Sequence, residues 1–192
     1  MAVKKTYIDA NQLLLDSYEL ALQVLESTFC PDIIVGVWRG GTPVAIAIQE
    51  LLQFLGRASD HIAIRTSHYT GINETAGSVS VYGLDYLVER VDADSKVLLV
   101  DDVFDTGRSL QQVTRELRQR CGDNTPTMKI ATPYFKPNNN TTTLLPDYYL
   151  HRTSEWLVFP HELDGLSAAE IATEKPGLGH LRERILHHYR QS

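Results

Sequence analysis

Short apolar runs of strand length alternate with segments of helical period over the first two thirds of the chain. Residues 33–37 and 96–100 are rich in valine, isoleucine and leucine, which is typical of strands buried on both faces of a sheet. A segment of helical period follows each run, and consecutive parallel strands require such a crossover. The alternation predicts an α/β fold with a central, mainly parallel sheet flanked by helices. Further strands are expected at residues 62–64 and 128–132, and helices at about residues 9–29, 44–55 and 106–120.

The pattern changes beyond Lys136. The polar run Asn-Asn-Asn-Thr-Thr-Thr at residues 138–143 predicts a loop. After it come short strand-like pieces at residues 148–150 and 156–159, and helical periods near residues 167–173 and 178–189. We therefore predict one domain over residues 1–192. It has a core at about residues 30–135, a small C-terminal hood at about residues 136–165, and C-terminal helices up to residue 192.

The composition excludes several classes of protein. With 43% hydrophobic residues among 192, the chain has enough apolar material to bury a core. A formal net charge of -6 argues against binding a nucleic-acid polymer through a basic surface. Cys30 and Cys121 are too far apart for a CxxC metal site. Because no signal peptide and no membrane-spanning run is evident, we expect a cytoplasmic protein without a membrane partner.

Residues 96–110, with the sequence KVLLVDDVFDTGRSL, carry the most specific chemical signal. The predicted strand delivers Asp101 and Asp102 to its carboxyl end, where ligands bind in open α/β sheets. Thr106 and Gly107 open a helix, whose free N–H groups and dipole favour an anion, and the hydroxyls of Thr106 and Ser109 add donors. The segment therefore predicts a cradle for a phosphate monoester. The two carboxylates beside it would bind a sugar diol, or Mg2+ through water.

Other interpretations of this segment exist. An Asp-Asp pair at the end of a strand also occurs in phospho-receiver domains, although there it lies close to the first strand and here it lies in mid-chain. Taken alone, the pair is also compatible with a structural helix cap. The segment is not a Walker A loop, because no Gly-Lys-Ser/Thr follows, and it is not a dinucleotide fingerprint, because GxGxxG is absent.

The run VLLVDDVFDTGRSL closely resembles the signature with which type I phosphoribosyltransferases bind 5-phosphoribosyl-1-diphosphate (PRPP). The resemblance implies the type I phosphoribosyltransferase fold. It places Asp101 and Asp102 at the ribose hydroxyls, partly through Mg2+, and residues 105–109 around the 5-phosphate. An acid at Asp105 is typical of the 6-oxopurine branch, where it accepts or donates the N7 proton of the base. The PRPP-binding residues implied are Asp101, Asp102, Asp105, Thr106, Gly107, Arg108 and Ser109.

Residues 35–45, with the sequence VGVWRGGTPVA, resemble the pyrophosphate loop of the family. Two glycines let backbone N–H groups approach an anion closely, and Arg39 supplies a forked cation that suits phosphate oxygens. The resemblance assigns Arg39 and Gly40 to pyrophosphate and implies a cis peptide bond between Trp38 and Arg39. The alternative is an ordinary strand–turn–helix junction with a surface arginine.

The polar residues 66–78 show no helical or strand period, so they predict a long loop. They resemble the mobile loop that closes over PRPP in this family and keeps water from the reacting ribose. Ser67 and Tyr69 would be its functional residues, with His68 as an additional residue between them. A plain surface loop is the alternative.

Residues 135–162 resemble the base-binding hood of the 6-oxopurine enzymes. Lys136 would bind the exocyclic O6, which disfavours adenine because its 6-amino group is a donor. Trp156 would stack on the purine, and Leu157 would offer backbone groups to its edge. Glu162 falls where the xanthine-guanine enzymes of bacteria have an acid near the base or the metal. A core tryptophan and a surface lysine are the alternatives.

The resemblance implies an enzyme that transfers the 5-phosphoribosyl group from PRPP to hypoxanthine, guanine or xanthine, with Mg2+ as cofactor. It also implies a homo-oligomer, either a dimer or a tetramer. The main alternative is a regulator of the same fold that binds PRPP or a nucleotide without catalysis, and the intact Asp105 and Lys136 argue against it. A second alternative is an enzyme for orotate or another pyrimidine.

Overall fold

The computed structural model describes residues 4–68 and 79–191 of the protein. The chain forms two compact units, one of residues Asp16–Ser154 and one of Met1–Leu15 together with Glu155–Ser192. The larger unit confirms the predicted α/β class with a mainly parallel sheet. The division into a core and a hood near residue 136 stays a prediction, and residues 136–154 belong to the larger unit.

A seven-stranded sheet forms the centre of the larger unit. Its strands are β2 (Ile33–Trp38), β3 (Asp60–His68), β4 (Val79–Tyr82), β5 (Lys96–Val100), β6 (Val103–Phe104), β7 (Thr127–Phe135) and β8 (Tyr148–Arg152). The strand order is β4-β3-β2-β5-β7-β6, and β8 also pairs with β7. Every pairing is parallel except that of β4 with β3. The carboxyl ends of β2 and β5, which are neighbours, therefore meet at the same edge of the sheet.

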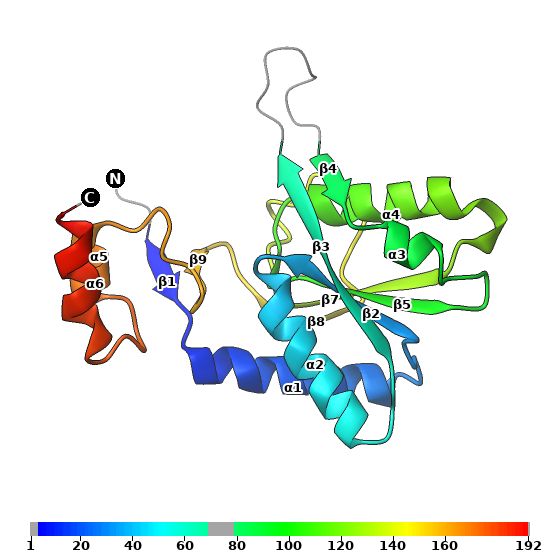
Figure 1. Cartoon of the computed structure of the whole chain (residues 1–192), viewed down its shortest axis with the longest axis horizontal. Helices are drawn as coiled ribbons and strands as arrows, with labels where there is room; N and C mark the ends of the chain where they lie inside the picture. Colours follow the sequence, from blue (N-terminus) through cyan, green and yellow to red (C-terminus); the bar gives the residue numbers. More distant parts are fainter. Residues whose placement is uncertain (1–3, 69–78, 192) are drawn as a thin grey trace, which may run out of the picture. The chain divides into compact units, whose positions relative to one another are not determined.

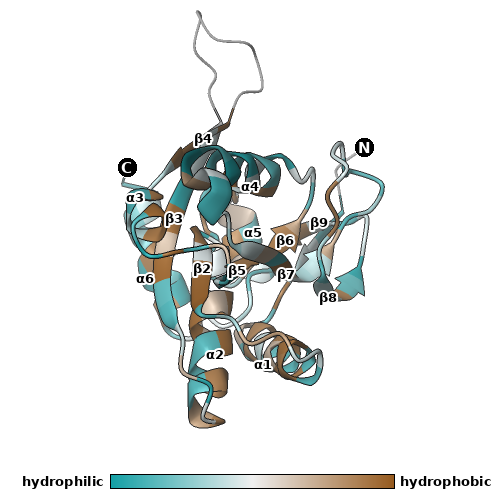
Figure 2. Cartoon of the chain, turned by 90° about the vertical axis from the view of Figure 1, so that its right-hand side faces the viewer, coloured by the Kyte–Doolittle hydropathy of each residue, from teal (hydrophilic) through white to brown (hydrophobic). Residues whose placement is uncertain are grey.

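Helices cover both faces of this sheet. They are α1 (Ala10–Glu26), α2 (Gly41–Phe54), α3 (Asp85–Val88) and α4 (Arg108–Cys121), and a 3-10 turn, η1 (Gly122–Asn124), follows α4. Figure 1 shows α2 on one face and α3 with α4 on the other. α4 buries Leu110, Val113 and Leu117, and its remaining surface is polar, as the teal colour in Figure 2 shows. Among the residues described, no helix is long and apolar enough to cross a membrane.

The predicted strands and helices of the larger unit are confirmed, and the structure adds β4, β6 and α3, which were not predicted. One prediction is wrong in part: residues 66–68 belong to β3 and not to a loop. The polar side chains of Thr66 and Ser67 suit a strand because β4 pairs with this segment antiparallel at the edge of the sheet, with Ser67 opposite Ser80. Such edge strands face water on one side and need no continuous apolar run.

The chain leaves the sheet at Asp101 and Asp102 and returns to it directly afterwards. β5 pairs with β7 as far as Ala131, and β6 pairs with β7 from Tyr134 onward. Both strands use the same edge of β7, because β8 occupies the opposite edge at the same residues. The two aspartates therefore lie in the short gap between β5 and β6, and both of these strands pair with the same edge of β7.

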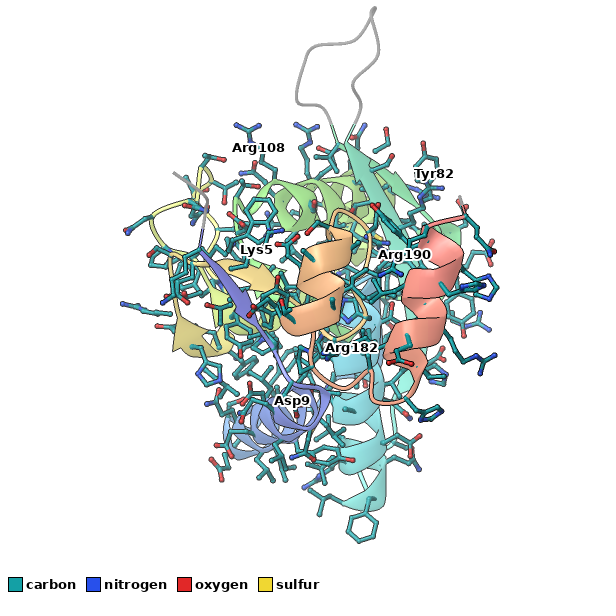
Figure 3. The ribbon with its side chains drawn as sticks, turned by 90° about the vertical axis from the view of Figure 1, so that its left-hand side faces the viewer. Lys5, Asp9, Tyr82, Arg108, Arg182 and Arg190 are labelled. Carbon is teal, nitrogen blue, oxygen red and sulfur yellow. The ribbon has the colours of Figure 1, made fainter. Side chains whose placement is uncertain are left out.

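The smaller unit contains residues from both ends of the chain. Its elements are β1 (Lys5–Tyr7), β9 (Trp156–Val158), α5 (Ala168–Thr173) and α6 (Leu181–Tyr189), of which β1 was not predicted because Lys-Thr-Tyr has no apolar run. β1 pairs parallel with β9. Nζ of Lys5, labelled in Figure 3, donates to Oε1 of Glu170 on α5 at 2.6 Å. Ser167 and Glu170 form a capping box at the start of α5. The small core of this unit consists of Val158, Leu166, Ile171 and Leu186.

A buried aspartate ties α1 to the sheet. The side chain of Asp16 is 7% exposed, and its Oδ2 lies 3.0 Å from Nε2 of His151 on β8. Tyr134 on β7 also hydrogen-bonds Asp16, and its ring lies against that of His151, with centroids 4.8 Å apart. Burial and the Asp16 carboxylate raise the pKa of Tyr134 to about 12, so its hydroxyl stays a neutral donor.

Asp16→Ala should lower the free energy of unfolding by about 2 kcal/mol, because the buried hydroxyl of Tyr134 and the ring of His151 lose their shared acceptor. Glu19→Ala, on the exposed side of the same helix, is the matched control and should change that free energy by less than about 0.5 kcal/mol. Urea denaturation followed by circular dichroism measures both variants. Equal effects would show that Asp16 contributes no more than a surface carboxylate.

Candidate active site

The loop that follows β2 lies against the carboxyl end of β5. A Cβ atom on Gly40 would lie 1.8 Å from Oδ2 of Asp102, and one on Gly41 would lie 2.2 Å from the carbonyl oxygen of Val100. Both distances are far below van der Waals contact. The backbone contact requires glycine at position 41, and any side chain at position 40 would displace the carboxylate of Asp102. The predicted pyrophosphate loop and the predicted acid pair therefore share one site.

The predicted cis peptide bond between Trp38 and Arg39 is present. Both side chains are exposed, and that of Trp38 is 55% exposed. The N–H of Thr42 donates to the carbonyl oxygen of Arg39 at 3.2 Å, which links this loop to the first turn of α2. Arg39 thus stands at the N-terminal end of α2, where the helix dipole also favours an anion.

Asp101 and Asp102 are adjacent carboxylates in a poorly hydrated position. Asp102 is 8% exposed, and the carboxylate of Asp101 accepts from the N–H groups of Asp102 and Gly41. Burial and the neighbouring Asp102 carboxylate raise the pKa of Asp101 well above its usual range. A ligand that brings a positive charge or hydroxyl donors would relieve the repulsion between the two.

A metal ion at this pair would depend on ligands from outside the protein. In residues 4–68 and 79–191, no group of three or more His, Cys, Asp or Glu side chains is arranged to hold a metal. Mg2+ commonly binds one or two carboxylates and takes its other ligands from waters and substrate phosphates. The donor set of Asp101 and Asp102 therefore fits Mg2+ that arrives with a phosphorylated substrate.

The turn from Asp105 to Ser109 encloses a hollow of about 130 Å³. Gly107 has a φ of 76° and directly precedes α4. A Cβ atom on Gly107 would lie 2.6 Å from Oγ1 of Thr142 and 2.8 Å from the ring of Phe104, so no larger residue fits. The hollow is much smaller than the roughly 300–1,000 Å³ of sites for drug-sized ligands, and at a helix N-terminus it suits a phosphate group. Its polar lining consists of Asp101, Asp105, Thr106 and Ser109.

The loop at residues 138–143 supports this turn from outside, which the sequence did not indicate. Thr141 donates to the carbonyl oxygen of Thr106 through its N–H at 3.1 Å and through its hydroxyl at 3.3 Å. Nε of Arg108 donates to Oγ1 of Thr141 at 3.2 Å. The guanidinium of Arg108 is thus held against the loop, and the first turn of α4 is fixed from a segment more than 30 residues away.

Asp105 lies between two side-chain donors. Nζ of Lys136 lies 2.9 Å from its Oδ2, and Nδ2 of Asn139 lies 2.8 Å from its Oδ1. The side chain of Lys136 is 8% exposed, so it is not a surface lysine. The predicted acid–base residue and the predicted O6-binding residue are therefore direct neighbours. Asn139 was not predicted, because nothing in the run Asn-Asn-Asn distinguishes the middle residue.

The profile of the phosphoribosyl transferase domain matches residues 5–165. The chain belongs to the phosphoribosyltransferase family. It is 23% identical over 185 residues to the hypoxanthine-guanine phosphoribosyltransferase of Streptococcus mutans, a match that covers 95% of this chain and 96% of that protein. The hypoxanthine-guanine phosphoribosyltransferase of Lactococcus lactis is 27% identical over 150 residues, which are 77% of this chain and 75% of that protein.

A solved structure agrees with this membership. The purine phosphoribosyltransferase from Pyrococcus horikoshii is 30% identical and superposes with a TM-score of 0.68, covering 85% of this chain and 97% of that chain. The expectation of a type I phosphoribosyltransferase from the 6-oxopurine branch, drawn from the motif at residues 97–110, is thereby confirmed.

Two predicted lid residues have different outcomes in this phosphoribosyltransferase. Ser67 lies on β3, opposite Ser80 of β4. Tyr69 lies outside the residues that the structure describes. The roles of both residues in closing over PRPP stay predictions.

The remaining predicted residues, Trp156, Leu157 and Glu162, belong to the smaller unit. Trp156 is 58% exposed, so it is not a core residue, whereas the side chain of Leu157 is buried. Oε2 of Glu162 accepts from the N–H of Phe159 at 2.9 Å. This bond engages one of the two carboxylate oxygens of Glu162 inside its own unit, and its role at a metal stays a prediction.

The backbone of Leu157 faces away from β1. The N–H of Ile8 donates to the carbonyl oxygen of Val158 at 2.9 Å, so Val158 faces β1. In a strand, the N–H and C=O groups of consecutive residues point to opposite edges. Those of Leu157 therefore point to the other edge of β9, along which no further strand of the described residues pairs.

A larger hollow of about 450 Å³ lies between α2 and the strands β2 and β3. Its lining is mainly apolar, with Ile34, Ala45 and Ile46, and its ionisable groups are Glu50 and His61. Among the residues that the structure describes, neither a lysine nor an arginine lines it. This hollow is therefore unsuited to a phosphorylated substrate, and size alone does not identify the site.

Asp101→Asn should raise the melting temperature of the ligand-free protein by a few degrees at about pH 8, because the folded state no longer holds two adjacent, poorly hydrated carboxylate charges. A carboxyl whose pKa is raised on folding stabilises the fold at low pH, and this contribution is lost as the pH rises through the raised pKa. The difference in melting temperature between Asp101→Asn and the parent protein should therefore disappear near pH 3, below the ordinary pKa of aspartate at about 3.9.

Thermal denaturation in a chelator-containing buffer, repeated across this pH range, measures the effect. Asp123→Asn, at an exposed position, is the matched control and should leave the pH dependence of melting unchanged. A variant at Asp101 that melts below the parent at pH 8 would contradict the proposed repulsion.

Proposed function

We propose that the protein transfers the 5-phosphoribosyl group from PRPP to a 6-oxopurine base (hypoxanthine, guanine or xanthine) and forms the nucleoside monophosphate and pyrophosphate. The observation that carries this proposal is the pair of Lys136 and Asp105 beside the phosphate-sized hollow. An ammonium donates to an oxo group at position 6, and a carboxylate accepts a proton from the adjacent N7. The hypoxanthine-guanine names of its relatives support the same class of base.

PRPP would bind along the two loops that meet at the end of β5. The 5-phosphate would occupy the hollow, where it accepts from the N–H groups of residues 106–109 and from the hydroxyls of Thr106 and Ser109. The ribose hydroxyls would donate to the carboxylates of Asp101 and Asp102. Arg39 and the backbone of Gly40 would bind the pyrophosphate group.

Mg2+ would be held by Asp101 and Asp102 together with oxygens of PRPP. When bound, it neutralises negative charge on the leaving pyrophosphate. The protein itself contributes Arg39, whose fixed positive charge stabilises the same leaving oxygens.

In the transfer step, the bond between C1 of the ribose and the pyrophosphate oxygen breaks, and N9 of the base bonds to C1. The base loses the proton on N7, which Asp105 accepts. Lys136 and Asn139 hold the carboxylate of Asp105 in position for this transfer. Trp156 would stack on the purine, and the outward backbone groups of Leu157 would bond to its edge.

A non-catalytic regulator of the same fold is the alternative. It would need the phosphate turn and the acid pair, but it would have no use for Asp105 held between two donors. The proposed closure of Ser67 and Tyr69 over PRPP, the cytoplasmic location and the homo-oligomeric state stay predictions.

The protein with Mg2+ and PRPP should convert hypoxanthine, guanine or xanthine to its monophosphate and leave adenine and orotate unchanged. The buried ammonium of Lys136 disfavours adenine, because it cannot accept a hydrogen bond from an amino group. Orotate is a pyrimidine and has no N7 proton for Asp105 to accept. Chromatography of the nucleotides and release of pyrophosphate measure the reaction. Binding of PRPP without product from any base would favour the regulator, and conversion of orotate would favour the pyrimidine enzyme.

Asp105→Asn should reduce kcat by about 10²–10⁴-fold, with little change in KM for PRPP, because an amide cannot accept the N7 proton. Asn139→Ala should reduce kcat by about tenfold, because the carboxylate of Asp105 loses one of its two positioning bonds. Asn138→Ala, at the exposed neighbouring position, is the control and should retain full activity. Steady-state kinetics distinguish the three variants, and unchanged turnover of Asp105→Asn would remove Asp105 from the mechanism.

A further inference from the structure

Lys175 is a fully buried lysine, and the proposed reaction does not use it. It lies in the smaller unit, two residues after the end of α5, and its exposure is 0%. Burial lowers the pKa of its amine, an effect that the nearby Glu162 carboxylate opposes. A buried amine is costly unless it is hydrogen-bonded, so its partner indicates why a lysine is present.

The partner of Lys175 is a backbone group directly after β9. Nζ of Lys175 donates to the carbonyl oxygen of Phe159. The same oxygen accepts from the N–H of Glu162 at 3.0 Å, and the N–H of Phe159 donates to Oε2 of Glu162 at 2.9 Å. Both backbone groups of Phe159 are therefore fixed, two residues beyond Leu157.

Lys175 is itself held by the two C-terminal helices. Its N–H donates to the carbonyl oxygen of Glu170 at 3.0 Å, and its carbonyl oxygen accepts from Arg182 at 2.7 Å. Arg182, which Figure 3 labels between α5 and α6, also donates to the carbonyl oxygen of Ala172 at 2.6 Å. A continuous set of hydrogen bonds thus runs from α6 through Lys175 to the end of β9.

We propose that Lys175 is a positioning residue for base binding. By holding the carbonyl of Phe159, it fixes the end of β9, so that the outward N–H and C=O groups of Leu157 keep one orientation toward the purine. This inference rests on the proposed function. It gives the C-terminal helices, which the motif resemblance does not explain, a role in the site.

An apolar side chain of similar length would fill the same space without burying an amine. Replacing a buried polar or charged group by a hydrophobic one is often neutral or stabilising. Lys175→Met therefore separates the filling of space from the holding of the Phe159 carbonyl, because it keeps the volume and removes only the bond to Phe159. Lys175→Gln keeps an amide donor and tests whether the bond can be restored.

The test combines kinetics with hydrogen exchange on the full-length protein. Lys175→Met should fold with an unchanged or higher melting temperature and raise KM for the purine about tenfold, while KM for PRPP changes by less than about twofold. In the ligand-free protein, the amides of residues 156–159 should exchange faster. Lys175→Gln should bring both the KM for the purine and the exchange rate of these amides most of the way back to the values of the parent protein. Lys4→Met, whose side chain is 83% exposed in the same unit, is the control and should match the parent.

Unchanged KM for the purine together with unchanged exchange in Lys175→Met would overturn the proposal and leave Lys175 as a space-filling residue. Equal increases in the KM for both substrates would also overturn it, because a general loss of structure has that effect. If the parent protein converts no purine, the proposed function fails. The exchange measurement then still reports whether Lys175 holds the end of β9.

Discussion

The close approach of the loop after β2 to the end of β5 is the constraint on which the rest of the site depends. Gly40 and Gly41 leave no room for a side chain between this loop and the acid pair. The approach leaves Asp101 poorly hydrated beside the buried Asp102, which raises the pKa of Asp101. Without substrate, the protein therefore holds two carboxylates that repel each other. Hydrogen bonds from a sugar diol, or a bound cation, would reduce this repulsion. A site of this kind is organised before its ligand binds.

The strand β7 determines how the remaining chemistry is assembled. It pairs with β5 and then with β6, so the chain departs from the sheet only where the two aspartates lie. It ends at Phe135, which places Lys136 beside Asp105. The loop that follows returns to the phosphate turn through Asn139 and Thr141. One strand thus connects the phosphate cradle, the acid–base residue and the group proposed to select the base.

Much of this was predictable from local patterns. The run KVLLV indicated a buried strand, and the DDVFDTGRS that follows indicated both the acids and the anion-binding turn, because each feature arises within a few residues. The cis bond at Trp38–Arg39 followed from resemblance alone. The strand residues 66–68 were missed because pairing with β4 stabilises them, and β4 begins only at Val79. The roles of Asn139 and Thr141 were missed because their partners lie more than 30 residues away.

The sequence by itself determined the fold class and the identity of the chemical groups, since strand burial, helix period and turn chemistry are local properties of the chain. Only the tertiary structure decided which of those groups act together. It shows that Lys136, whose exposure the sequence did not indicate, is buried and forms an ion pair with Asp105. It also joined Lys175 to the carbonyl of Phe159 across 16 residues. Hydrogen bonds and ion pairs between distant segments depend on how the sheet and helices pack, and no local pattern encodes that packing.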